Sequence, residues 1–194
     1  MAAGLAEPDR RVIIVEPKAS WPSEFDAISR SLRDALGPLA LRIDHIGSTA
    51  VPGLASKDVI DIQVTVARLA DADPLAAAGF RAQPFLRDHV PPGAVDDERE
   101  WTKRFFNLPD DERRGNVHIR VDGRANQRYP LLFRDYLRAY PSAAEAYGRL
   151  KVSLAKELAD AESYPDVKDP ACDLIWIAAE DWAAATGWVL GTTS

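Results

Sequence analysis

Hydrophobic and polar positions divide this chain into a first part typical of strands and a second part typical of helices. Up to about residue 122, short runs rich in Val, Ile and Phe are separated by turns of Gly, Pro and charged residues, as in half-buried strands. From Asn126 onwards, apolar residues recur every three or four positions, which indicates amphipathic helices. The pattern predicts an α/β (α+β) fold: a mixed sheet over about 11–122 flanked by helices, and a helical C-terminal part over about 126–188. No linker separates the two parts, so residues 1–194 are expected to form one domain.

The individual elements follow from the same periodicities. A helix is expected at 21–36, with Ser20 as its N-cap, because apolar residues there keep a helical spacing until a Gly-Pro pair. An acid followed by a proline, Asp169-Pro170, indicates where the last helix begins. The segment 87–100, with Pro-Pro-Gly and four acids, is expected to be an exposed loop. The expected strands lie at 11–15, 40–46, 58–66, 80–86, 101–108 and 116–121, and the further helices at 73–78, 127–139, 142–161 and 170–186.

Residues 44–54 read Asp-His-Ile-Gly-Ser-Thr-Ala-Val-Pro-Gly-Leu and form the most informative segment of the chain. Gly47 lets the backbone turn after a strand and admits a ligand close to the main chain. Ser48 and Thr49 add hydroxyls and amides, and amides at such a helix start are suited to anions. The segment is therefore a candidate phosphate site, although an ordinary turn would use the same residue types.

The strand that follows carries Asp61 and Gln63 on one face, because side chains alternate along a strand. An unpaired carboxylate among Val and Ile residues is costly to bury, so Asp61 is expected to meet a metal ion or a cation. The alternative is that Asp61 lies at a solvent-exposed strand end. On a later strand, the same alternation places His118 and Arg120 together. An imidazole there could bind a metal or move a proton, although a lone His on a strand is more often a hydrogen-bonded core residue.

A set of short runs spread along the chain carries a family resemblance: 45–54, Lys57, Ile60-Asp61-Ile62, Arg104-Phe-Phe106, Val117-His118-Ile119, 132–138, and Tyr164 with Lys168. The set resembles the GrpB family and covers about residues 11–188. That family is assigned to the nucleotidyltransferase superfamily, which implies a nucleotidyltransferase-like sheet. The superfamily pattern is Gly, then Gly or Ser, a gap, an acid, a hydrophobic residue and a second acid. Gln63 stands where the second acid belongs, and it removes one of the two carboxylates that normally bracket a pair of metal ions.

The resemblance implies a site for a nucleoside triphosphate, with ATP as the expected one, together with Mg²⁺ or Mn²⁺. Asp61 and Gln63 are the implied metal ligands, and Asp61, His118 and Arg120 are the implied catalytic residues. Asp122, at the end of the same strand as His118, is a weaker candidate for the missing carboxylate. The expected nucleotide- and phosphate-binding residues are Gly47, Ser48, Thr49, Lys57, Arg104, Lys151 and Lys168.

Several of these cations also have plain structural interpretations. Lys57 would be an ordinary solvated Lys at a strand start, and Arg104 would be a charge that protects an edge strand. Lys151 lies at the margin of an apolar helix stripe, where a Lys buries its stem and directs its ammonium into a cleft. Lys168 lies in the break expected before Pro170, from which it would reach either a ligand or water.

Composition narrows the class of protein. With 46% hydrophobic and 28% charged residues, the 194-residue chain is neither disordered nor built like a membrane protein, since no apolar run approaches the roughly 20 residues of a membrane span. The first ten residues lack the apolar core of a signal peptide, so a cytoplasmic location is expected. Cys172 is the single cysteine, which excludes an intramolecular disulfide. A net charge of −6 disfavours nucleic acid as a partner but not a small phosphorylated ligand.

Three functions are compatible with these observations. The leading one is magnesium-dependent transfer of a nucleotidyl or phosphoryl group from an NTP to a small-molecule acceptor. The second is a non-catalytic nucleotide-binding or sensing module, favoured by the neutral Gln63. The third, weaker one is a phosphohydrolase with water as acceptor. The acceptor, the base preference and the oligomeric state do not follow from the sequence.

Overall fold

The computed structural model describes residues 11–109, 113–158 and 163–191. Within these ranges the strands form one five-stranded mixed sheet in the order β1-β2-β5-β4-β3. Neighbouring strands are antiparallel except for the central pair β2 and β5, which is parallel. The predicted α+β fold with a mixed sheet is therefore confirmed. The strands are β1 (Arg42–Ile46), β2 (Ile60–Val66), β3 (Arg81–Gln83), β4 (Arg104–Asn107) and β5 (Gly115–Val121).

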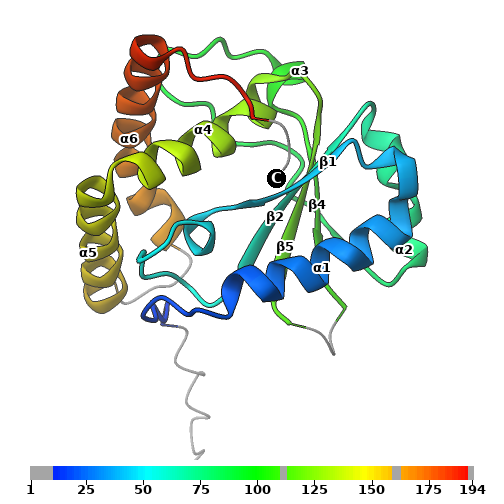
Figure 1. The fold of residues 1–194 in the computed structure, drawn as a ribbon, viewed down its shortest axis with the longest axis horizontal. Coiled ribbons are helices and arrows are strands. Elements are labelled where there is room, and N and C mark those ends of the chain that lie inside the picture. The colour runs from blue at the N-terminus through cyan, green and yellow to red at the C-terminus, as the bar shows by residue number, and fades with distance from the viewer. Residues whose placement is uncertain (1–10, 110–112, 159–162, 192–194) are drawn as a thin grey trace, which may run out of the picture.

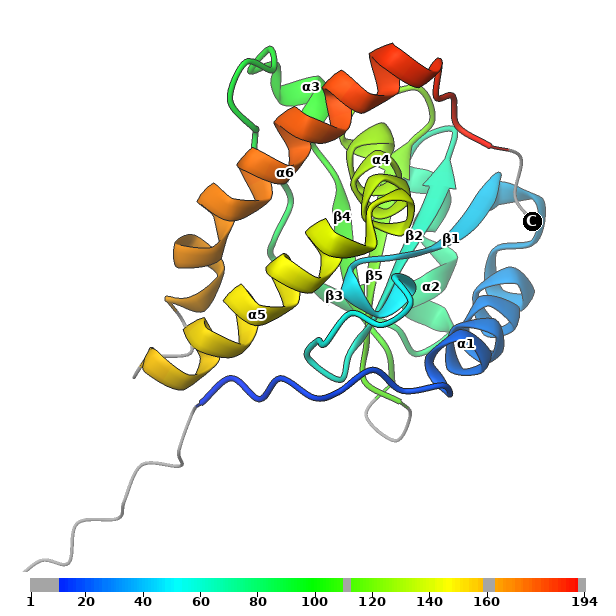
Figure 2. The ribbon, with the colours of Figure 1, turned by 60° about the vertical axis from the view of Figure 1, so that its left-hand side comes forward.

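Helices cover both faces of this sheet (Figure 1). Helices α1 and α2 lie on one side, and α4, α5 and α6 gather on the other, as the turned view in Figure 2 also shows. The predicted helical C-terminal segment is confirmed by these last three. The helices are α1 (Trp21–Leu36), α2 (Pro74–Ala77), α3 (Glu98–Trp101), α4 (Ala125–Ala139), α5 (Pro141–Glu157) and α6 (Tyr164–Thr186), with 3₁₀ turns η1 (Gly37–Leu39), η2 (Ser48–Ala50) and η3 (Leu69–Ala72).

The apolar core lies between α1 and the sheet. Ile28 and Leu32 recur at helical spacing along α1 and are buried against the apolar face of the central strands. Each such aliphatic side chain contributes about 1.5–3 kcal/mol when it is fully removed from water. Alternation then directs the remaining side chains of the two central strands to the opposite face, toward α4, α5 and α6. The core-facing strand residues are Ile60, Ile62, Val64, Val66, Val117 and Ile119.

Several predicted boundaries are wrong. The segment 11–15 makes only a single bridge, between Val15 and Ser56, instead of a strand. The strand expected at 101–108 starts at Arg104, because Trp101 ends the short helix α3. Ser20 occupies the N-cap position of α1, but its side chain makes no capping hydrogen bond.

The last helix begins earlier than predicted. Ser163 is its N-cap and Pro165 lies in its first turn, so α6 starts at Tyr164 and Pro170 is inside the helix. A proline signal of the same kind thus occurs twice, and the earlier one marks the start. Lys168 accordingly lies on a helix and not in a break. Helix α5 ends at Glu157, and Ala161, the predicted end, lies outside the described residues.

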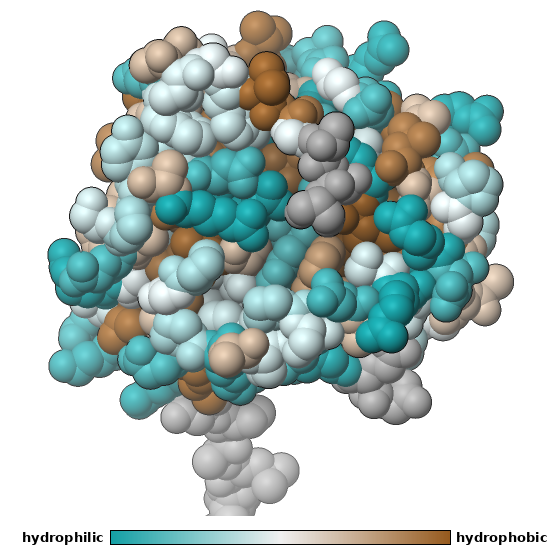
Figure 3. Space-filling model, in the orientation of Figure 1, coloured by the Kyte–Doolittle hydropathy of each residue, from teal (hydrophilic) through white to brown (hydrophobic). Residues whose placement is uncertain are grey.

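The surface in Figure 3 is mostly hydrophilic or intermediate, with hydrophobic side chains scattered over the face of the molecule that it shows. Among the described residues, no helix is long and apolar enough to cross a membrane. After α6 the chain turns at Gly187 and runs back toward β1, where Arg42 Nη1 donates to the carbonyl oxygen of Gly191 at 2.7 Å (Figure 2). The end of the described chain therefore packs beside the first strand.

Candidate functional site

The polar face of the sheet and helices α4, α5 and α6 enclose a pocket of about 560 Å³. We call it the sheet–helix pocket. It gathers most of the residues predicted from the sequence, and these come from five different segments of the chain. Its lining includes Gly47, Ser48, Lys57, Asp61, His118, Arg120, Lys151 and Lys168.

The bend at Gly47 and Ser48 faces Asp61 directly. Gly47 has a φ of 69°, a left-handed conformation that favours glycine. A Cβ added to Gly47 would lie 2.5 Å from Asp61 Oδ2, so no other residue fits there without displacing the carboxylate. The predicted arrangement, a glycine–serine bend and an aspartate that share one pocket, is confirmed.

Asp61 is held in place but remains accessible. It pairs across the parallel strands with Asn116, whose Nδ2 donates to Asp61 Oδ1 at 2.8 Å. The side chain of Asp61 keeps 30% of its surface exposed. The carboxylate therefore lies at the wall of the pocket with Oδ2 beside the Gly47 backbone, a position from which it can bind a cation.

His118 lies next to Asp61 in the pocket. Its Nδ1 is 3.3 Å from Lys103 Nζ, and its Nε2 is 3.9 Å from Asp61 Oδ1. Burial lowers the pKa of His118 to about 4, so the imidazole is neutral at pH 7. Since an ammonium only donates, Nδ1 accepts and Nε2 carries the proton. In this state Nε2–H is a hydrogen-bond donor, and a role for His118 as a base or a metal ligand at Nε2 would require the other tautomer. The catalytic role of His118 stays a prediction.

A paired network supports His118 from behind. We use this name for Gln63, Asp88, Lys103 and Arg120. Asp88 accepts from Arg120 Nε at 2.8 Å, from Arg120 Nη2 at 2.9 Å and from Lys103 Nζ at 2.5 Å. Burial alone would raise the pKa of Asp88, but Arg120 and Lys103 hold it well below its usual range. Each charge of the network thus has a partner within it.

Gln63 completes this network and does not line the pocket. Its Oε1 accepts from Arg120 Nη1 at 2.8 Å, and its Nε2 donates to the carbonyl oxygen of Gln127 at 2.9 Å. The side chain is fully buried. Both amide atoms are committed to the protein, so the structure gives no support to the prediction that Gln63 ligates a metal.

Three lysines form the opposite wall of the pocket. We call Lys57, Lys151 and Lys168 the lysine cluster. Lys57 Nζ lies 4.3 Å from the centre of the Tyr164 ring, and Lys168 Nζ donates to Cys172 Sγ at 3.2 Å. Burial, and then repulsion from Lys168, lower the pKa of Lys57.

Lys151 is the unusual member of the lysine cluster. It is only 3% exposed, and its Nζ has no hydrogen-bond partner among the described residues. The ammonium lies 4.8 Å from the centre of the Tyr147 ring, a weak cation–π contact. Burial, followed by repulsion from Lys168, lowers the pKa of Lys151 to about 7. A buried cation beside other cations is a costly arrangement that an anion would relieve.

Besides Gln63, three predicted residues do not join the pocket. Arg104 lies on the other face of the sheet, where its Nη1 donates to Asp73 Oδ1 at 2.6 Å and to the carbonyl oxygen of Leu69. Thr49 points away from the pocket, and its Oγ1 lies 2.9 Å from His45 Nε2. Asp122 is exposed at the far end of β5, so it cannot replace the missing carboxylate in this pocket.

Several residues of the pocket were not predicted from the sequence. Lys103 enters it instead of Arg104, because the two lie on opposite sides of the chain and the strand begins one residue later than Lys103. Asn116 shares the parity of His118, which could have identified it. Asp88 lies in the segment expected to be an exposed loop and carried no signal. Other pocket residues not predicted include Asn126, Tyr129 and Cys172.

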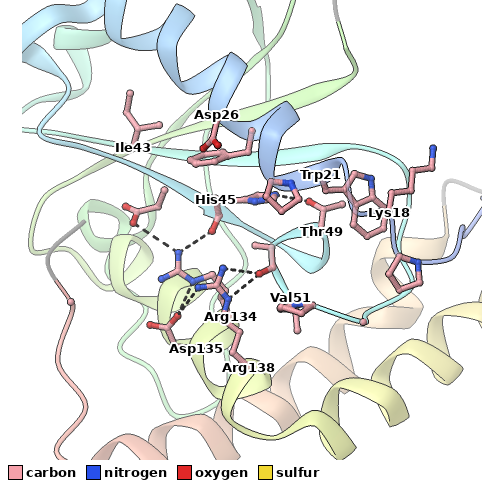
Figure 4. A pocket seen from close by; sticks show the side chains of 18 of the residues that line it. Lys18, Trp21, Asp26, Ile43, His45, Thr49, Val51, Arg134, Asp135 and Arg138 are labelled. Carbon is pink, nitrogen blue, oxygen red and sulfur yellow. Dashed lines mark hydrogen bonds and ion pairs between the residues drawn. The ribbon is translucent and has the colours of Figure 1, made fainter. Parts of the chain in front are cut away.

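A second pocket, of about 530 Å³, lies on the other side of the bend (Figure 4). Arg134 and Arg138 project from α4 into it, as Figure 4 shows. Arg134 Nη1 donates to the carbonyl oxygen of His45 at 2.9 Å. Arg138 donates to the carbonyl oxygen of Ala50 through Nε at 2.9 Å and Nη2 at 2.7 Å. The two arginines therefore fix the backbone on both sides of the bend.

The site offers limited protein ligands to a metal ion. No group of three or more His, Cys, Asp or Glu side chains gathers to hold a metal within the part of the chain that the structure describes. Among the described residues, three carboxylates line the pocket: Asp88 is bonded to Arg120 and Lys103, and Asp169 lies 3.6 Å from Lys168 Nζ, which leaves Asp61 as the one without a cationic partner. One carboxylate suits Mg²⁺, an ion that usually takes one or two carboxylates and completes its shell with water and substrate phosphates. The residues therefore fit a magnesium ion that arrives with a polyphosphate, and they do not fit a pair of metals bracketed by two carboxylates.

The fold and the pocket define the class: an α+β protein in which one face of a mixed sheet and three C-terminal helices enclose a cationic pocket beside a glycine–serine bend. Residues 11–176 match the protein family described as GrpB protein, and the chain belongs to this family. It is 42% identical to a protein of Mycolicibacterium paratuberculosis named dephospho-CoA kinase, over 91% of this chain and 48% of the relative. It is 33% identical to UPF0157 protein BH1888 of Halalkalibacterium halodurans, over 81% of this chain and 76% of the relative.

The chain spans about half the length of the mycobacterial relatives it matches. Among solved structures, the conserved protein GrpB from Enterococcus faecalis matches with a TM-score of 0.69 and 28% identity, over 88% of this chain and 99% of that chain. The Cid1 poly(U) polymerase matches with a TM-score of 0.46 and 14% identity, over 71% of this chain and 40% of that chain. A likeness of this size carries no inference about activity.

Proposed function

We propose that this protein binds a magnesium–nucleoside triphosphate in the sheet–helix pocket and transfers a nucleotidyl or phosphoryl group to a small-molecule acceptor. The observation that carries the proposal is the unpartnered ammonium of Lys151. It lines the same pocket as Lys57, Lys168 and Asp61. Together these residues supply what a metal-bound polyphosphate needs, which is clustered positive charge and a carboxylate for the ion.

Electrostatics favour the phosphates at the lysine cluster. A phosphate charge 4 Å from an ammonium gains about 4 kcal/mol at an effective dielectric constant of 20, before desolvation is subtracted. The protein has already desolvated Lys151 during folding, so much of that cost is met before the ligand arrives. The terminal phosphates of the ligand would therefore be held by Lys57, Lys151 and Lys168.

The reacting group would lie near the bend. Ser48 offers its hydroxyl there, and His118 Nε2–H is directed toward Asp61. Asp61 would hold the magnesium ion, which supplies charge neutralisation and orientation when it is bound. Burial, with a smaller contribution from Arg120 and Lys103, keeps His118 neutral, so Nε2–H is available to donate a hydrogen bond to the charge that develops on the transferred group.

The proposal includes phosphoryl transfer as well as nucleotidyl transfer, because only one carboxylate among the described residues of the pocket is available to a metal ion. Two-metal reactions normally use two carboxylates, whereas Gln63 is bound inside the paired network. The mycobacterial relatives named dephospho-CoA kinase carry the name of a phosphoryl transfer, although this chain corresponds to about half of each. That nucleic acid is not a partner also remains a prediction. A small acceptor and a cytoplasmic location remain parts of the proposal.

The test combines binding with product analysis. Calorimetry with ATP in the presence and absence of Mg²⁺ measures affinity, and mass spectrometry follows each NTP incubated with Mg²⁺ and a pooled metabolite extract. Release of pyrophosphate identifies nucleotidyl transfer, and loss of one phosphate identifies phosphoryl transfer. Phosphate released without any acceptor would identify a phosphohydrolase instead. Failure of ATP and of inorganic triphosphate to bind would overturn the proposal.

A non-catalytic nucleotide-binding or sensing module is the second candidate. The observation that favours it is again Gln63, which is neutral, fully buried and hydrogen-bonded on both amide atoms. Such a module would bind ATP with the same affinity whether or not Mg²⁺ is present, and would yield no product with any NTP. Magnesium-dependent affinity accompanied by a product would exclude it.

A further inference from the structure

Buried polar atoms without a partner are concentrated around the sheet–helix pocket. Four buried side-chain atoms lack a hydrogen-bond partner in the described part of the chain. Three of them belong to residues that line this pocket: Asn126 Oδ1, Lys151 Nζ and Tyr164 Oη. Such atoms are rare in folded proteins because each is costly to leave unpaired. Lys151 Nζ and Tyr164 Oη are donors at the lysine cluster. Asn126 Oδ1 is an acceptor, and the proposed function gives it no role.

The orientation of the Asn126 amide is fixed by its neighbours. Its Nδ2 lies 3.1 Å from Asp88 Oδ2 and 3.1 Å from the carbonyl oxygen of Thr102. Both of these are acceptors, so the NH₂ group must point to them and the oxygen must point elsewhere. Asn126 is 1% exposed. Both hydrogens of its NH₂ group are therefore used within the protein, and its oxygen remains as a buried acceptor without a donor among the described residues.

Helix α4 separates this acceptor from the lysine cluster. Asn126, Tyr129 and Phe133 line the pocket at positions i, i+3 and i+7 of one helix face. Seven residues of helix rise about 10 Å. Beyond Phe133, the Tyr147 ring lies 5.9 Å away in an edge contact, and Lys151 Nζ lies 4.8 Å from that ring. The acceptor and the unpartnered ammonium thus mark opposite ends of a path lined by aromatic rings.

The surroundings of Asn126 suit a flat, uncharged group. Tyr129 packs against Trp176 with ring centres 6.4 Å apart and meets Trp101 at the same distance in an edge contact. The nearby charges, Asp88 and Arg120, are already paired with each other. An aromatic wall with one acceptor is the environment in which a nucleobase stacks and donates a hydrogen bond.

We propose that Asn126 Oδ1 accepts a hydrogen bond from the exocyclic amino group of the bound nucleotide's base, so that the protein prefers amino bases such as adenine and cytosine. The inference rests on the proposed function, which places the triphosphate at Lys57, Lys151 and Lys168. A keto oxygen at the same position of guanine or uracil would face the Asn126 oxygen and repel it. Sites built to bond a polar substrate group reject analogues that lack the group far more strongly than apolar pockets do.

The matched pair of ligands is ATP and purine riboside triphosphate, which differs from ATP only by loss of the amino group. Calorimetry on the unaltered protein with Mg²⁺ should show ATP binding at least about tenfold more tightly. In Asn126→Ala the two affinities should agree within about twofold, because the distinguishing acceptor is gone. CTP should likewise bind more tightly than UTP to the unaltered protein.

Inorganic triphosphate provides the control. It would contact only the lysine cluster, so Asn126→Ala should bind it as the unaltered protein does, which shows that the pocket still folds. Equal affinity of the unaltered protein for ATP and purine riboside triphosphate would overturn the inference and leave the proposed function standing. Failure of all these ligands, inorganic triphosphate included, would overturn the proposed function as well.

Discussion

The two walls of the sheet–helix pocket differ in how their charges are satisfied. In the paired network, Arg120 donates to Asp88 through Nε and Nη2 and to Gln63 Oε1 through Nη1. In the lysine cluster, Lys151 Nζ has no hydrogen-bond partner among the described residues, and its strongest interaction with another charge is repulsion from Lys168. A paired buried network rigidifies a structure, whereas an unpaired buried charge is a cost to it. We therefore infer that the paired network holds the pocket in shape and that the lysine cluster binds the ligand, with Asp61 between the two.

The largest effect is expected from Asp61, where the two walls meet. Asp61→Ala should lower NTP turnover by at least about a thousandfold, because the single carboxylate for the metal is lost. Turnover is measured with saturating Mg²⁺, and circular dichroism confirms that the fold is intact. Asp122→Ala is the matched control, since Asp122 is exposed away from the pocket, and it should retain normal turnover. Normal turnover in Asp61→Ala would remove Asp61 from the mechanism.

Lys151→Met should separate binding from stability. We expect affinity for inorganic triphosphate to fall about ten- to a hundredfold, because one of three cations is lost at a desolvated site. The free energy of unfolding should rise by about 1 kcal/mol or more, because an apolar side chain of similar length replaces a buried unpaired charge. Calorimetry and urea denaturation measure the two quantities. If Lys151→Met is less stable than the unaltered protein and binds inorganic triphosphate with unchanged affinity, Lys151 stabilises the fold and does not bind the ligand.

The lysine cluster also predicts opposite pH trends for binding and stability. The pKa of Lys151 is lowered from 10.5 to about 7, so the unfolded chain binds more protons than the folded one between these values. Stability from this group therefore rises with pH from about 7 to 10.5, by at most about 1.4 kcal/mol per pH unit. Affinity for triphosphate should fall over the same range as Lys151 loses its charge. Both trends are measured in the unaltered protein and should weaken in Lys151→Met.

A smaller effect is expected from the arginines behind the bend. Arg138→Ala removes both hydrogen bonds to the Ala50 carbonyl, which loosens the backbone that carries Ser48. We expect KM for the NTP to rise about three- to tenfold with a smaller change in kcat. Arg138→Lys should recover part of the loss because one donor remains. A fall in thermal stability with unchanged KM would show that Arg138 only stabilises the fold.

The smallest effect is expected from Arg104, which the sequence placed in the site and the structure places on the other face. Arg104→Ala should leave NTP affinity within about twofold of normal, since its partners are Asp73 and Leu69. Lys103→Ala is the matched comparison, because Lys103 contacts Asp88 and His118 in the pocket. A large loss of affinity in Arg104→Ala alone would reverse the assignment of the two faces.

Much of the fold could be predicted because it depends on local periodicity. The helix at 21–36 has the predicted bounds, and alternation correctly placed Asp61 with Gln63 on one face of β2 and His118 with Arg120 on one face of β5. Arg104 was expected in the pocket from the family resemblance and not from alternation. It is the first residue of the four-residue strand β4, and its side chain lies on the other face of the sheet.

The site itself was only partly predictable because its partners come from distant segments. The hydrogen bond between Asp88 and Arg120 joins residues 32 positions apart. The local pattern around either residue gives no indication that the two are paired. Gln63 was interpreted through the position of a missing acid, whereas tertiary packing committed its amide to Arg120 and Gln127. Hydrogen-bond partners of this kind depend on the packing of α4 against the sheet, which local patterns do not encode.

The most direct test of the account is a crystal structure of the protein with Mg²⁺ and a non-hydrolysable ATP analogue. We expect the terminal phosphates to lie within hydrogen-bonding distance of Lys151 Nζ, and the magnesium ion to bind Asp61. An analogue bound elsewhere, for example in the pocket on the other side of the bend, with Lys151 still unpartnered, would contradict it.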